Sequence, residues 1–262
     1  MNLGLSGKSV FIAASSKGLG RAAALEFAKE GALVTIASRS LGQLEEARDE
    51  IRAATGQEAT MVRMDVLSPD DIKNAIRHAV DSAGGLDILV TNAGGPPSGF
   101  FSDMGDEDWT GGFELNLLSA IRMIREALPH LKSAGGGRIV NLASTSVKQP
   151  IDGLILSNVF RAGVQALTKS LSSELANDGI LINTIAPGRI ATDRITELDS
   201  KRAEDQGSSL EQFQTAAVKA IPLGRMGTPE EFARFVVFYG SFANTYVTGQ
   251  TLLVDGGMVR AI

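Results

Sequence analysis

The stretch Ala13-Ala14-Ser15-Ser16-Lys17-Gly18-Leu19-Gly20 decides the fold, because it joins a short apolar run to a helical pattern through a turn that contains glycine. The run Ser9–Ala13 before it has the composition of a buried strand, and the segment Gly20–Glu30 after it carries small and apolar residues on one helical face. Glycines in such a turn let the backbone approach a pyrophosphate, and the helix N-terminus presents free N–H groups to it. The turn therefore predicts a dinucleotide site, although a tight turn without a ligand is the alternative for a glycine cluster taken alone.

The same alternation of short apolar runs and helical patterns continues along the 262 residues. It is typical of βαβ units whose helices cover both faces of a parallel sheet. We expect an α/β fold, a single-domain Rossmann fold over residues 1–262 with a seven-stranded parallel sheet doubly wound by helices. The expected strands are Ser9–Ala13, Leu33–Ala37, Thr60–Met64, Asp87–Val90, Arg138–Leu142, Leu181–Ile185 and Thr251–Val254.

Capping sequences at Ser68-Pro69-Asp70-Asp71 and Thr228-Pro229-Glu230-Glu231 predict two helix starts. Long helices are expected at Asp106–Ser133 and Leu154–Asn177. The segment 188–227 interrupts the alternation with charged, weakly periodic sequence, and an insertion of this length in a compact domain favours a functional lid. We therefore expect a substrate lid at about 188–227, with a solvated helix pair as the alternative.

Composition and charge exclude several classes of function. The formal net charge of -5 argues against a nucleic-acid partner, because phosphate backbones are bound by clustered Lys and Arg. The chain has no cysteine and only two histidines, far apart in the sequence, so no disulfide, thiolate nucleophile or metal site is expected. No apolar run is long enough for a membrane span, and the N-terminus lacks a signal-peptide pattern. We expect a cytoplasmic protein with no membrane partner.

The whole length resembles the short-chain dehydrogenase/reductase family, in particular its 3-oxoacyl-carrier-protein-reductase-like members. The family turn has the form Thr-Gly-x-x-x-Gly-x-Gly, and this chain matches it except that Ala14 replaces the first glycine. Thr91-Asn92-Ala93-Gly94 resembles the family's Asn-Asn-Ala-Gly element, and Val254-Asp255-Gly256-Gly257 closes the last strand as the family does. Because alanine costs little at a compatible backbone angle, we expect slight loosening of the turn at most, with cofactor binding retained.

The resemblance implies a set of contacts to the dinucleotide. Asp65 and Val66 correspond to the pair that meets the adenine ring, and the element at Asn92 supports the sheet beside the cofactor. Pro187-Gly188 with Thr192 resembles the motif that holds the carboxamide side of nicotinamide. The cofactor-binding residues expected on this basis are Ser15, Ser16, Lys17, Gly18, Leu19, Gly20, Arg39, Asp65, Val66, Asn92, Ala93, Gly94, Arg161, Pro187, Gly188 and Thr192.

The residues after the second strand favour NADP(H) over NAD(H). An acidic side chain there usually bonds the ribose 2'-hydroxyl of NAD(H), whereas the 2'-phosphate of NADP(H) needs cations. This chain has Ser38-Arg39-Ser40 at that point, and Lys17 in the turn adds a second positive charge. Arg39 can donate two N–H bonds to phosphate oxygens. The alternative is that both side chains are solvated surface cations.

The family's catalytic Tyr-x-x-x-Lys pair does not recur. In the family the Tyr hydroxyl donates a proton to the substrate carbonyl, and the Lys lowers the pKa of that Tyr from about 10. The corresponding positions hold Ser157 and Arg161. An alkyl hydroxyl is a far weaker acid than a phenol, and a guanidinium stays protonated, so we expect Ser157 to be a poor proton donor and Arg161 to bind the nicotinamide ribose. Tyr239 and Tyr246, the two tyrosines of the chain, are not positional substitutes.

Other candidate catalytic residues come from the resemblance and from the neighbouring loop. Asn116 corresponds to the family's Asn for the proton-relay water, and Ser144 corresponds to its substrate-orienting Ser. Lys148 and Asp152 lie between Ser144 and Ser157, where family members line the substrate pocket, and either could titrate if buried. A solvated loop charge is the simpler interpretation of each.

Two functions from different classes remain open. The first is an NADP(H)-dependent oxidoreductase acting on a small-molecule carbonyl or alcohol with a non-standard catalytic site. The second is a catalytically silent NADP(H)-binding module or partner subunit, which the fold alone does not exclude. The resemblance also implies a homotetramer or homodimer built from the two long helices and the C-terminal strand region. The candidate catalytic residues are Ser144, Asn116, Ser157, Arg161 and Lys148.

Overall fold

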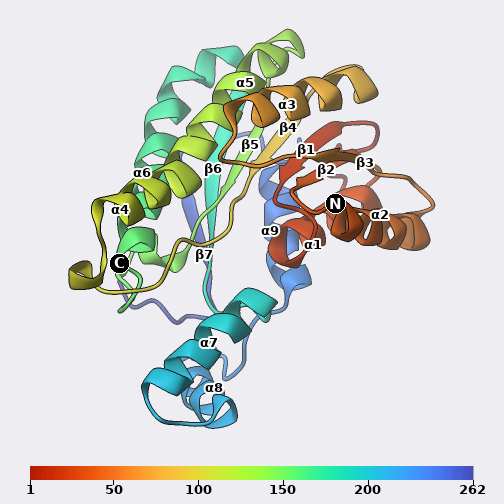
Figure 1. The fold of residues 1–262 in the computed structure, drawn as a ribbon. Helices are drawn as coiled ribbons and strands as arrows, with labels where there is room; N and C mark the ends of the chain where they lie inside the picture. The colour runs from red at the N-terminus through yellow and green to blue at the C-terminus, as the bar shows by residue number, and fades with distance from the viewer. Residues whose placement is uncertain (262) are drawn as a thin grey trace.

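The computed structural model describes residues 1–261, which form one parallel sheet between two layers of helices (Figure 1). The predicted Rossmann fold with seven parallel strands is confirmed, and the strand order is β3-β2-β1-β4-β5-β6-β7. Most strand ends lie within one or two residues of their predicted positions. The strands are β1 Ser9–Ala13, β2 Leu33–Ser38, β3 Thr60–Arg63, β4 Ile88–Thr91, β5 Gly137–Leu142, β6 Ile180–Pro187 and β7 Thr251–Val254.

The strand order reverses direction between β1 and β4. The chain moves outward from β1 to β2 and β3, then returns to pair Val10 of β1 with Ile88 of β4 before it continues to β7. In a sheet of this kind the two connections leave on opposite faces, and a crevice opens beyond the carboxyl ends of β1 and β4. The fold therefore places the glycine turn at the position where sheets of this kind bind ligands.

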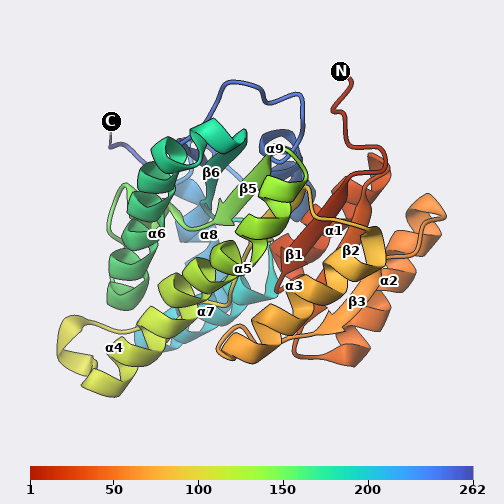
Figure 2. The same cartoon turned by 90° about the horizontal axis from the view of Figure 1, so that it is seen from above.

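Helices α1 (Gly18–Lys29), α2 (Leu41–Thr55) and α9 (Pro229–Tyr239) cover one face of the sheet. Helices α3 (Pro69–Ala83), α5 (Ser119–Ser133) and α6 (Ile155–Glu174) cover the other (Figure 2). Both predicted capping sequences begin helices, because the side chains of Ser68 and Thr228 each accept a backbone N–H in the first turn of α3 and α9. Each face has its own apolar core, so the sheet is a rigid platform for the crevice.

The predicted long helix Asp106–Ser133 is not regular. It consists of α4 (Asp106–Phe113), a π-helical turn (Glu114–Leu118) and α5. The hydrophobic period does not show this, because a π-turn shifts the register without changing the residue types. The predicted helix Leu154–Asn177 is α6 followed by a separate short turn, and the helix after the glycine turn begins two residues earlier than predicted.

The segment 188–227 forms α7 (Asp193–Asp205) and α8 (Leu210–Lys219), which lie beyond the carboxyl ends of the strands and apart from both helix layers (Figure 1). A parallel bridge between Ile190 and Gly227 joins the start and end of the segment. Inside it, Arg189 donates a hydrogen bond to the fully buried carboxylate of Asp199 at 2.6 Å. The segment is thus anchored at the crevice, although its action as a lid stays a prediction.

Among residues 1–261, no helix is both long and apolar enough to cross a bilayer. The same residues contain no cluster of three or more side chains suited to ligate a metal ion.

Candidate functional site

The glycine turn forms a cradle that fits a dinucleotide pyrophosphate. Gly18 has a positive φ of 57°, and a Cβ on Gly20 would collide with the carbonyl oxygen of Ala14. The N-cap residue of α1 is Lys17, whose side chain makes no capping hydrogen bond within residues 1–261. The first N–H groups of α1 are therefore available to a phosphate, which also interacts favourably with the positive end of the helix dipole.

Ala14 is strained. Its φ of 47° lies in the left-handed region, and it is the one non-glycine residue with a positive φ in the described part of the chain. An L-residue with a Cβ pays about 1–2 kcal/mol for this conformation. The expectation that the backbone angle here suits alanine is therefore wrong. The carbonyl of Ala14 accepts a hydrogen bond from the side-chain amide of Asn92 at 3.1 Å, which helps to hold the turn in place.

The serines of the turn face inward. The fully buried hydroxyl of Ser15 donates to the carbonyl of Ile12 at 2.8 Å and accepts from the N–H of Ala37 at 2.9 Å. Ser16 bonds to the side chain of Gln43 on α2 at 3.3 Å. The backbone N–H of Ser15 also donates to the carbonyl of Ala37 at 3.1 Å, so both of its donors are used to tie the ends of β1 and β2 together.

Two cations stand at this edge of the sheet. Lys17 follows β1 and Arg39 follows β2, and both side chains are exposed. Because Ala13 pairs with Ala37 in a parallel ladder, the two strands end at the same level and the cations flank the same crevice. Asp65 and Val66 follow β3 at the next position along this edge, where the carboxylate of Asp65 accepts the N–H of Leu67 at 3.0 Å.

The motif at the end of β6 reaches the glycine turn from the other side. Gly188 donates its N–H to the carbonyl of Val254 at 2.9 Å, and a Cβ on Gly188 would lie 2.7 Å from the Cα of Asp255. A Cβ on Gly18 would be 3.8 Å from the methyl group of Thr192. The start of α7 therefore lies across from the turn, and residues far apart in sequence meet around one crevice.

Arg161 lies at the carboxyl ends of β4 and β5. Its Nη1 donates to the carbonyl of Leu142 at 2.7 Å, and its Nη2 lies 3.4 Å from the carbonyl of Ala93 and 3.5 Å from that of Gly94. The side chain is 7% exposed. Burial, and then the nearby charge of Arg194, lower the pKa of Arg161 to about 10, so the guanidinium is charged at neutral pH.

Ser157 lies one helical turn before Arg161 on α6 and is 8% exposed. Residues four apart on a helix share a face, so both side chains are directed toward the same region. Close packing at two glycines holds this part of α6 against α4 and the π-turn. A Cβ on Gly112 would lie 3.0 Å from the ring of Phe160, and one on Gly163 would lie 2.7 Å from Leu117.

Asn116 lies in the π-turn with an unused acceptor. Its Nδ2 donates to the carbonyl of Gly112 at 3.3 Å, but its buried Oδ1 has no hydrogen-bond partner within residues 1–261. A buried acceptor without a partner is destabilising, so it indicates a place for a water or a ligand group. Isolated π-turns are frequent at functional sites. Ser144 caps the short turn after β5, where its hydroxyl accepts the N–H of Ser146 at 3.2 Å.

A family model described as enoyl-(acyl carrier protein) reductase matches residues 13–259. A 3-oxoacyl-[acyl-carrier-protein] reductase, FabG, from Chlamydia pneumoniae is 34% identical over 261 residues, with 98% of this chain and 99% of the relative covered. The chain belongs to the short-chain dehydrogenase/reductase family. This assignment confirms the resemblance and makes the chain a member of an NAD(P)-dependent oxidoreductase family of enzymes.

Solved structures of short-chain dehydrogenases/reductases have the same fold. The L-sorbose reductase from Gluconobacter frateurii, solved in complex with NADPH and L-sorbose, superposes with a TM-score of 0.94 at 33% identity and covers 100% of both chains. YwfH, an NADPH-dependent reductase involved in bacilysin biosynthesis, superposes with a TM-score of 0.93 at 26% identity and covers 97% of this chain and 99% of its own.

Asn116, Ser144, Ser157 and Arg161 are the candidate catalytic cluster of this short-chain dehydrogenase/reductase. Two charged residues of the neighbouring loop are exposed instead of buried with it. Lys148 is exposed and lines a surface pocket between α6 and the start of β7, together with Gln165 and Lys169. Asp152 is also exposed, and its carbonyl accepts a hydrogen bond from Arg202 at 2.8 Å. Neither side chain is buried, which was the condition for an unusual titration. Lys148 stays a candidate with no support from burial.

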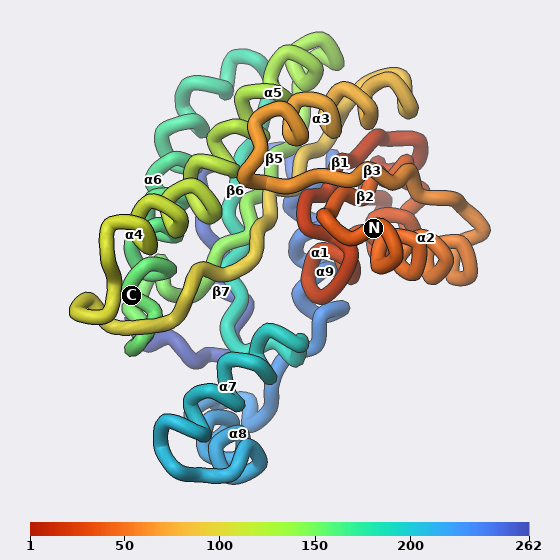
Figure 3. The backbone as a smooth tube through the Cα atoms, viewed as in Figure 1, coloured from red at the N-terminus to blue at the C-terminus, as the bar shows by residue number. Residues whose placement is uncertain are grey.

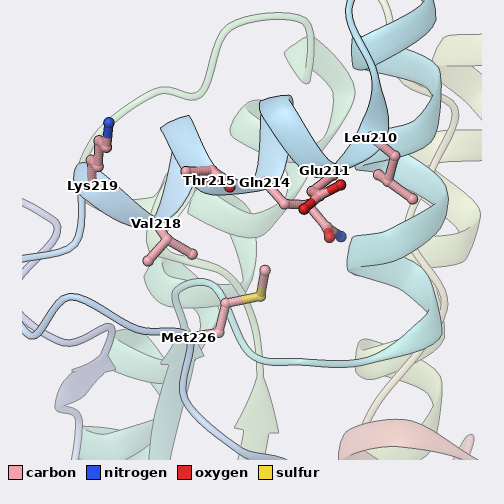
Figure 4. A pocket seen from close by; sticks show the side chains of 7 residues that line it. All are labelled: Leu210, Glu211, Gln214, Thr215, Val218, Lys219 and Met226. Carbon is pink, nitrogen blue, oxygen red and sulfur yellow. The ribbon is translucent and has the colours of Figure 1, made fainter.

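A second surface pocket also lies away from the candidate catalytic residues. It has a volume of about 660 Å³ and opens on the 188–227 segment, between α8 and Met226 (Figure 4). Its apolar lining comes from Leu210, Val218 and Met226, and Ser144, Ser157 and Arg161 do not line it. No tyrosine approaches the cluster. Tyr239 belongs to α9 on the other side of the sheet, and Tyr246 is 95% exposed in the loop before β7.

Sequence reasoning missed a series of buried polar side chains that hydrogen-bond to one another in this short-chain dehydrogenase/reductase. Thr91 of β4 donates to Asn141 of β5 at 2.6 Å, and Asn141 donates to Thr168 of α6 at 2.8 Å. Thr168 in turn bonds to Thr184 of β6 at 2.8 Å. This hydrogen-bond network joins α6 to β4, β5 and β6. It therefore helps to hold the helix that carries Ser157 and Arg161 in place against the sheet. Polar residues inside otherwise apolar strands were the signal.

Sequence reasoning counted Arg194 among the mixed charges of the 188–227 segment and gave it no role of its own. It lies in the first turn of α7, two residues after Thr192, and its Nη2 donates to the carbonyl of Pro96 at 3.1 Å. The segment containing it was interpreted as an amphipathic lid with mixed charges, so no single cation stood out. Its partner lies 98 residues away in the chain, and that relation is visible only in the fold.

Proposed function

We propose that this chain is an NADP(H)-dependent oxidoreductase that acts on the carbonyl or alcohol group of a small molecule, with Ser157 and Arg161 in place of the family's Tyr and Lys. The observation that carries the proposal is the position of Arg161. It is a buried cation at the carboxyl ends of β4 and β5, one helical turn after Ser157 and beside the crevice of the glycine turn. Polar groups of this kind in a crevice at the switch point of a Rossmann sheet are typical of a catalytic site.

Lys17 and Arg39 support NADP(H) as the cofactor. Both are exposed cations at the edge where the adenosine half of a dinucleotide would lie, and a guanidinium binds a phosphate through two parallel bonds. The sorbose reductase and YwfH are both described with NADPH. When bound, NADP(H) would supply or accept the hydride. The glycine turn would hold its pyrophosphate, and Gly188 and Thr192 would lie against its nicotinamide half.

Side chains of this protein would stabilise charge on the substrate, orient it and help to supply a proton. Arg161 places a fixed positive charge where negative charge develops on a substrate oxygen, and such preorganised charge lowers the barrier. Ser144 and Ser157 can orient that oxygen by donating hydrogen bonds, although neither is an acid of useful strength. The Oδ1 of Asn116, which has no partner within residues 1–261, can hold a water through which a proton from bulk solvent would reach that oxygen. Arg161 keeps its own proton and serves for binding and charge stabilisation.

The alternative proposal is a silent NADP(H)-binding module or partner subunit. The presence of Ser157 where the family has a phenol favours it, because the replacement removes the strongest proton donor of the site. Asn116 and Ser144, retained at their expected positions, favour the enzyme.

Turnover decides between the two. NADPH absorbance is followed with a panel of aldehydes and ketones for the parent chain and for Ser144→Ala, Ser157→Ala and Arg161→Ala. We expect slow turnover by the parent, and a loss of about 100-fold on removal of a group that stabilises the developing charge. Ser170→Ala is the matched control, because Ser170 is exposed on the same helix and bonds only to the carbonyl of Ala166. NADPH binding without turnover of any substrate would leave the silent module.

Self-association into a homodimer or homotetramer also stays a proposal. Exposed aromatic side chains gather around α4, where Phe101 packs edge-on against Trp109, and Trp109 packs against Phe160 of α6. Phe113 is also partly exposed and packs against Phe160. Contiguous exposed aromatic surface is typical of protein interfaces. Sedimentation analysis that finds only monomer would remove this proposal. A cytoplasmic location likewise stays a prediction.

A further inference from the structure

Two arginines are buried within residues 1–261, and their surroundings differ. Arg138, at the start of β5, donates to the carbonyls of Ser241 and Asn244 at 2.8–3.2 Å, and its guanidinium lies 4.7 Å from the ring centre of Phe242. With a further bond from Nη1 to the carbonyl of Gly137 at 2.9 Å, all three guanidinium nitrogens of Arg138 have an acceptor. Arg161 is equally buried but has one short bond, to Leu142, and two contacts at 3.4 and 3.5 Å. A guanidinium has five N–H donors, so Arg161 keeps unused capacity.

Arg161 also lacks a counter-charge. Within residues 1–261, no carboxylate lies within 4.0 Å of it. The charge that affects the pKa of Arg161 comes from another cation, because burial and then Arg194 both lower that pKa. A buried charge is costly unless it is paired, and two like charges add repulsion. An anion placed against both guanidinium groups would remove both costs.

Arg194 contacts the same loop from α7. Its Nη2 donates to the carbonyl of Pro96, and a Cβ on Gly95 would lie 2.8 Å from that nitrogen. Farther along α7, Lys201 donates to the hydroxyl of Ser98 at 3.2 Å. Figure 3 shows the stretch after β4, drawn in yellow, passing the carboxyl edge of the sheet on the side where α7 lies. Cations of α6 and of α7 therefore converge on the loop 93–98.

One carboxylate lies near this group. Glu197 is 3.8 Å from Arg194, and both side chains are substantially exposed, so the pair is weak and leaves the fork of Arg194 largely free. The cofactor pyrophosphate has its own cradle at the N-terminus of α1, beyond β1. The unpaired charge lies at the ends of β4 and β5, where a substrate would meet the nicotinamide half of the cofactor.

We infer that Arg161 and Arg194 together bind a carboxylate of the substrate, so that this chain acts on oxo acids or hydroxy acids rather than on neutral carbonyl compounds. The inference rests on the proposed function, because it assigns the substrate class of that same site. A carboxylate has two oxygens in the geometry that guanidinium groups bind through parallel bonds. Arg194 comes from the 188–227 segment, so binding of the carboxylate would also hold this segment against the crevice.

Binding of simple probes tests the inference without turnover. The NADPH-loaded full chain is titrated by calorimetry with succinate and with its uncharged analogue succinamide. We expect succinate to bind at least about tenfold more tightly, a preference that Arg194→Gln abolishes and Arg194→Lys partly keeps, since lysine retains the charge without the fork. Lys219→Gln removes a cation from α8 on the same segment and should leave the preference unchanged. Equal binding of the two probes, or binding of neither, overturns the inference.

Two further measurements separate the possible failures. If Arg194→Gln weakens NADPH binding and leaves succinate binding unchanged, the anion is the cofactor's own phosphate and the inference is wrong. If the chain reduces pyruvate and methyl pyruvate with equal kcat/KM, the oxidoreductase stands but the substrate class is wrong. If succinate is preferred but neither compound is turned over, the proposed oxidoreductase activity fails while the carboxylate site stands.

Discussion

The side-chain amide of Asn92 donates a hydrogen bond to the carbonyl oxygen of Ala14 at 3.1 Å and joins the end of β4 to the turn after β1. These are the two strands between which the sheet reverses its order. The bond therefore spans the base of the crevice in which a dinucleotide would lie. It also holds the one residue of the turn whose backbone is strained.

Replacement of Ala14 by glycine should raise the stability of the fold. Glycine adopts a φ of 47° without steric cost, which removes about 1–2 kcal/mol of strain. Its more flexible unfolded chain offsets about 0.4–1 kcal/mol of that gain. We expect a net gain of up to about 1.6 kcal/mol and a rise in Tm of about 2–4 °C for each kcal/mol gained, measured by thermal unfolding. Ala13→Gly, one residue earlier in β1, should lower Tm. A fall in Tm with Ala14→Gly would contradict the strain.

Replacement of Arg39 by alanine should reduce the preference for NADP(H). Hydrogen bonds to a charged group contribute about 1.5–3 kcal/mol, so the Kd of NADPH should rise by about one to two orders of magnitude. The Kd of NADH should change little, because NADH lacks the 2'-phosphate. Fluorescence titration of both cofactors measures the ratio. Arg77→Ala removes an exposed cation from α3 and should change neither Kd. An equal rise in the Kd of both cofactors would show that Arg39 does not bind the 2'-phosphate.

The parallel sheet and the glycine cradle were predictable because both follow from local patterns. Apolar runs such as Ile88–Thr91 are buried on both faces, and the turn at Gly18 needs a glycine for its own backbone angle. The contact of Arg194 and the hydrogen-bond network that links Thr91 to Thr184 were not predictable in the same way. Their partners lie far away in sequence, so their roles depend on which strands and loops the fold brings together.

The strain at Ala14 was predictable only in part. The motif showed that a glycine was missing, but only the backbone angle shows that the position is left-handed. Ser157 and Arg161 were placed by the resemblance to the family's Tyr-x-x-x-Lys pair. That no carboxylate within residues 1–261 pairs with Arg161 depends on every element packed around it.

Replacement of Asp199 by asparagine should loosen the 188–227 segment. Asp199 is fully buried and pairs with Arg189, and loss of one partner leaves the other charge buried and unpaired, which typically costs about 3–5 kcal/mol. We expect the low end of that range, because Asp199 Oδ1 and Arg189 Nε already lack partners within residues 1–261. Limited proteolysis should cut the segment faster in Asp199→Asn than in Asp205→Asn, whose side chain is exposed on the same helix. Equal cleavage would show that the pair does not hold the segment.

Glu231 should give the start of α9 a stability that depends on pH. Its carboxylate accepts two bonds from Arg225, at 2.7 and 2.8 Å, and the N–H of Thr228 at 2.9 Å. The bond from Arg225, followed by that from Thr228, lowers the pKa of Glu231 from 4.5 to about 2. Because the pKa is lower in the folded state, the ionised carboxylate stabilises the fold above pH 4.5, and this stabilisation is lost as the pH falls toward 2.

The variant Glu231→Gln isolates this charge, because glutamine keeps an acceptor for the N–H of Thr228 while it loses the ion pair with Arg225. Its Tm should be lower than that of the parent at pH 7, and the difference should shrink as the pH falls from 4.5 toward 2. Added salt should also reduce the difference, since the pair is exposed. Glu230→Gln, the exposed neighbour in the same first turn, is the matched control and should show the smaller change at pH 7. A difference between Glu231→Gln and the parent that is constant from pH 7 to pH 2 would assign the effect to packing rather than to the carboxylate charge.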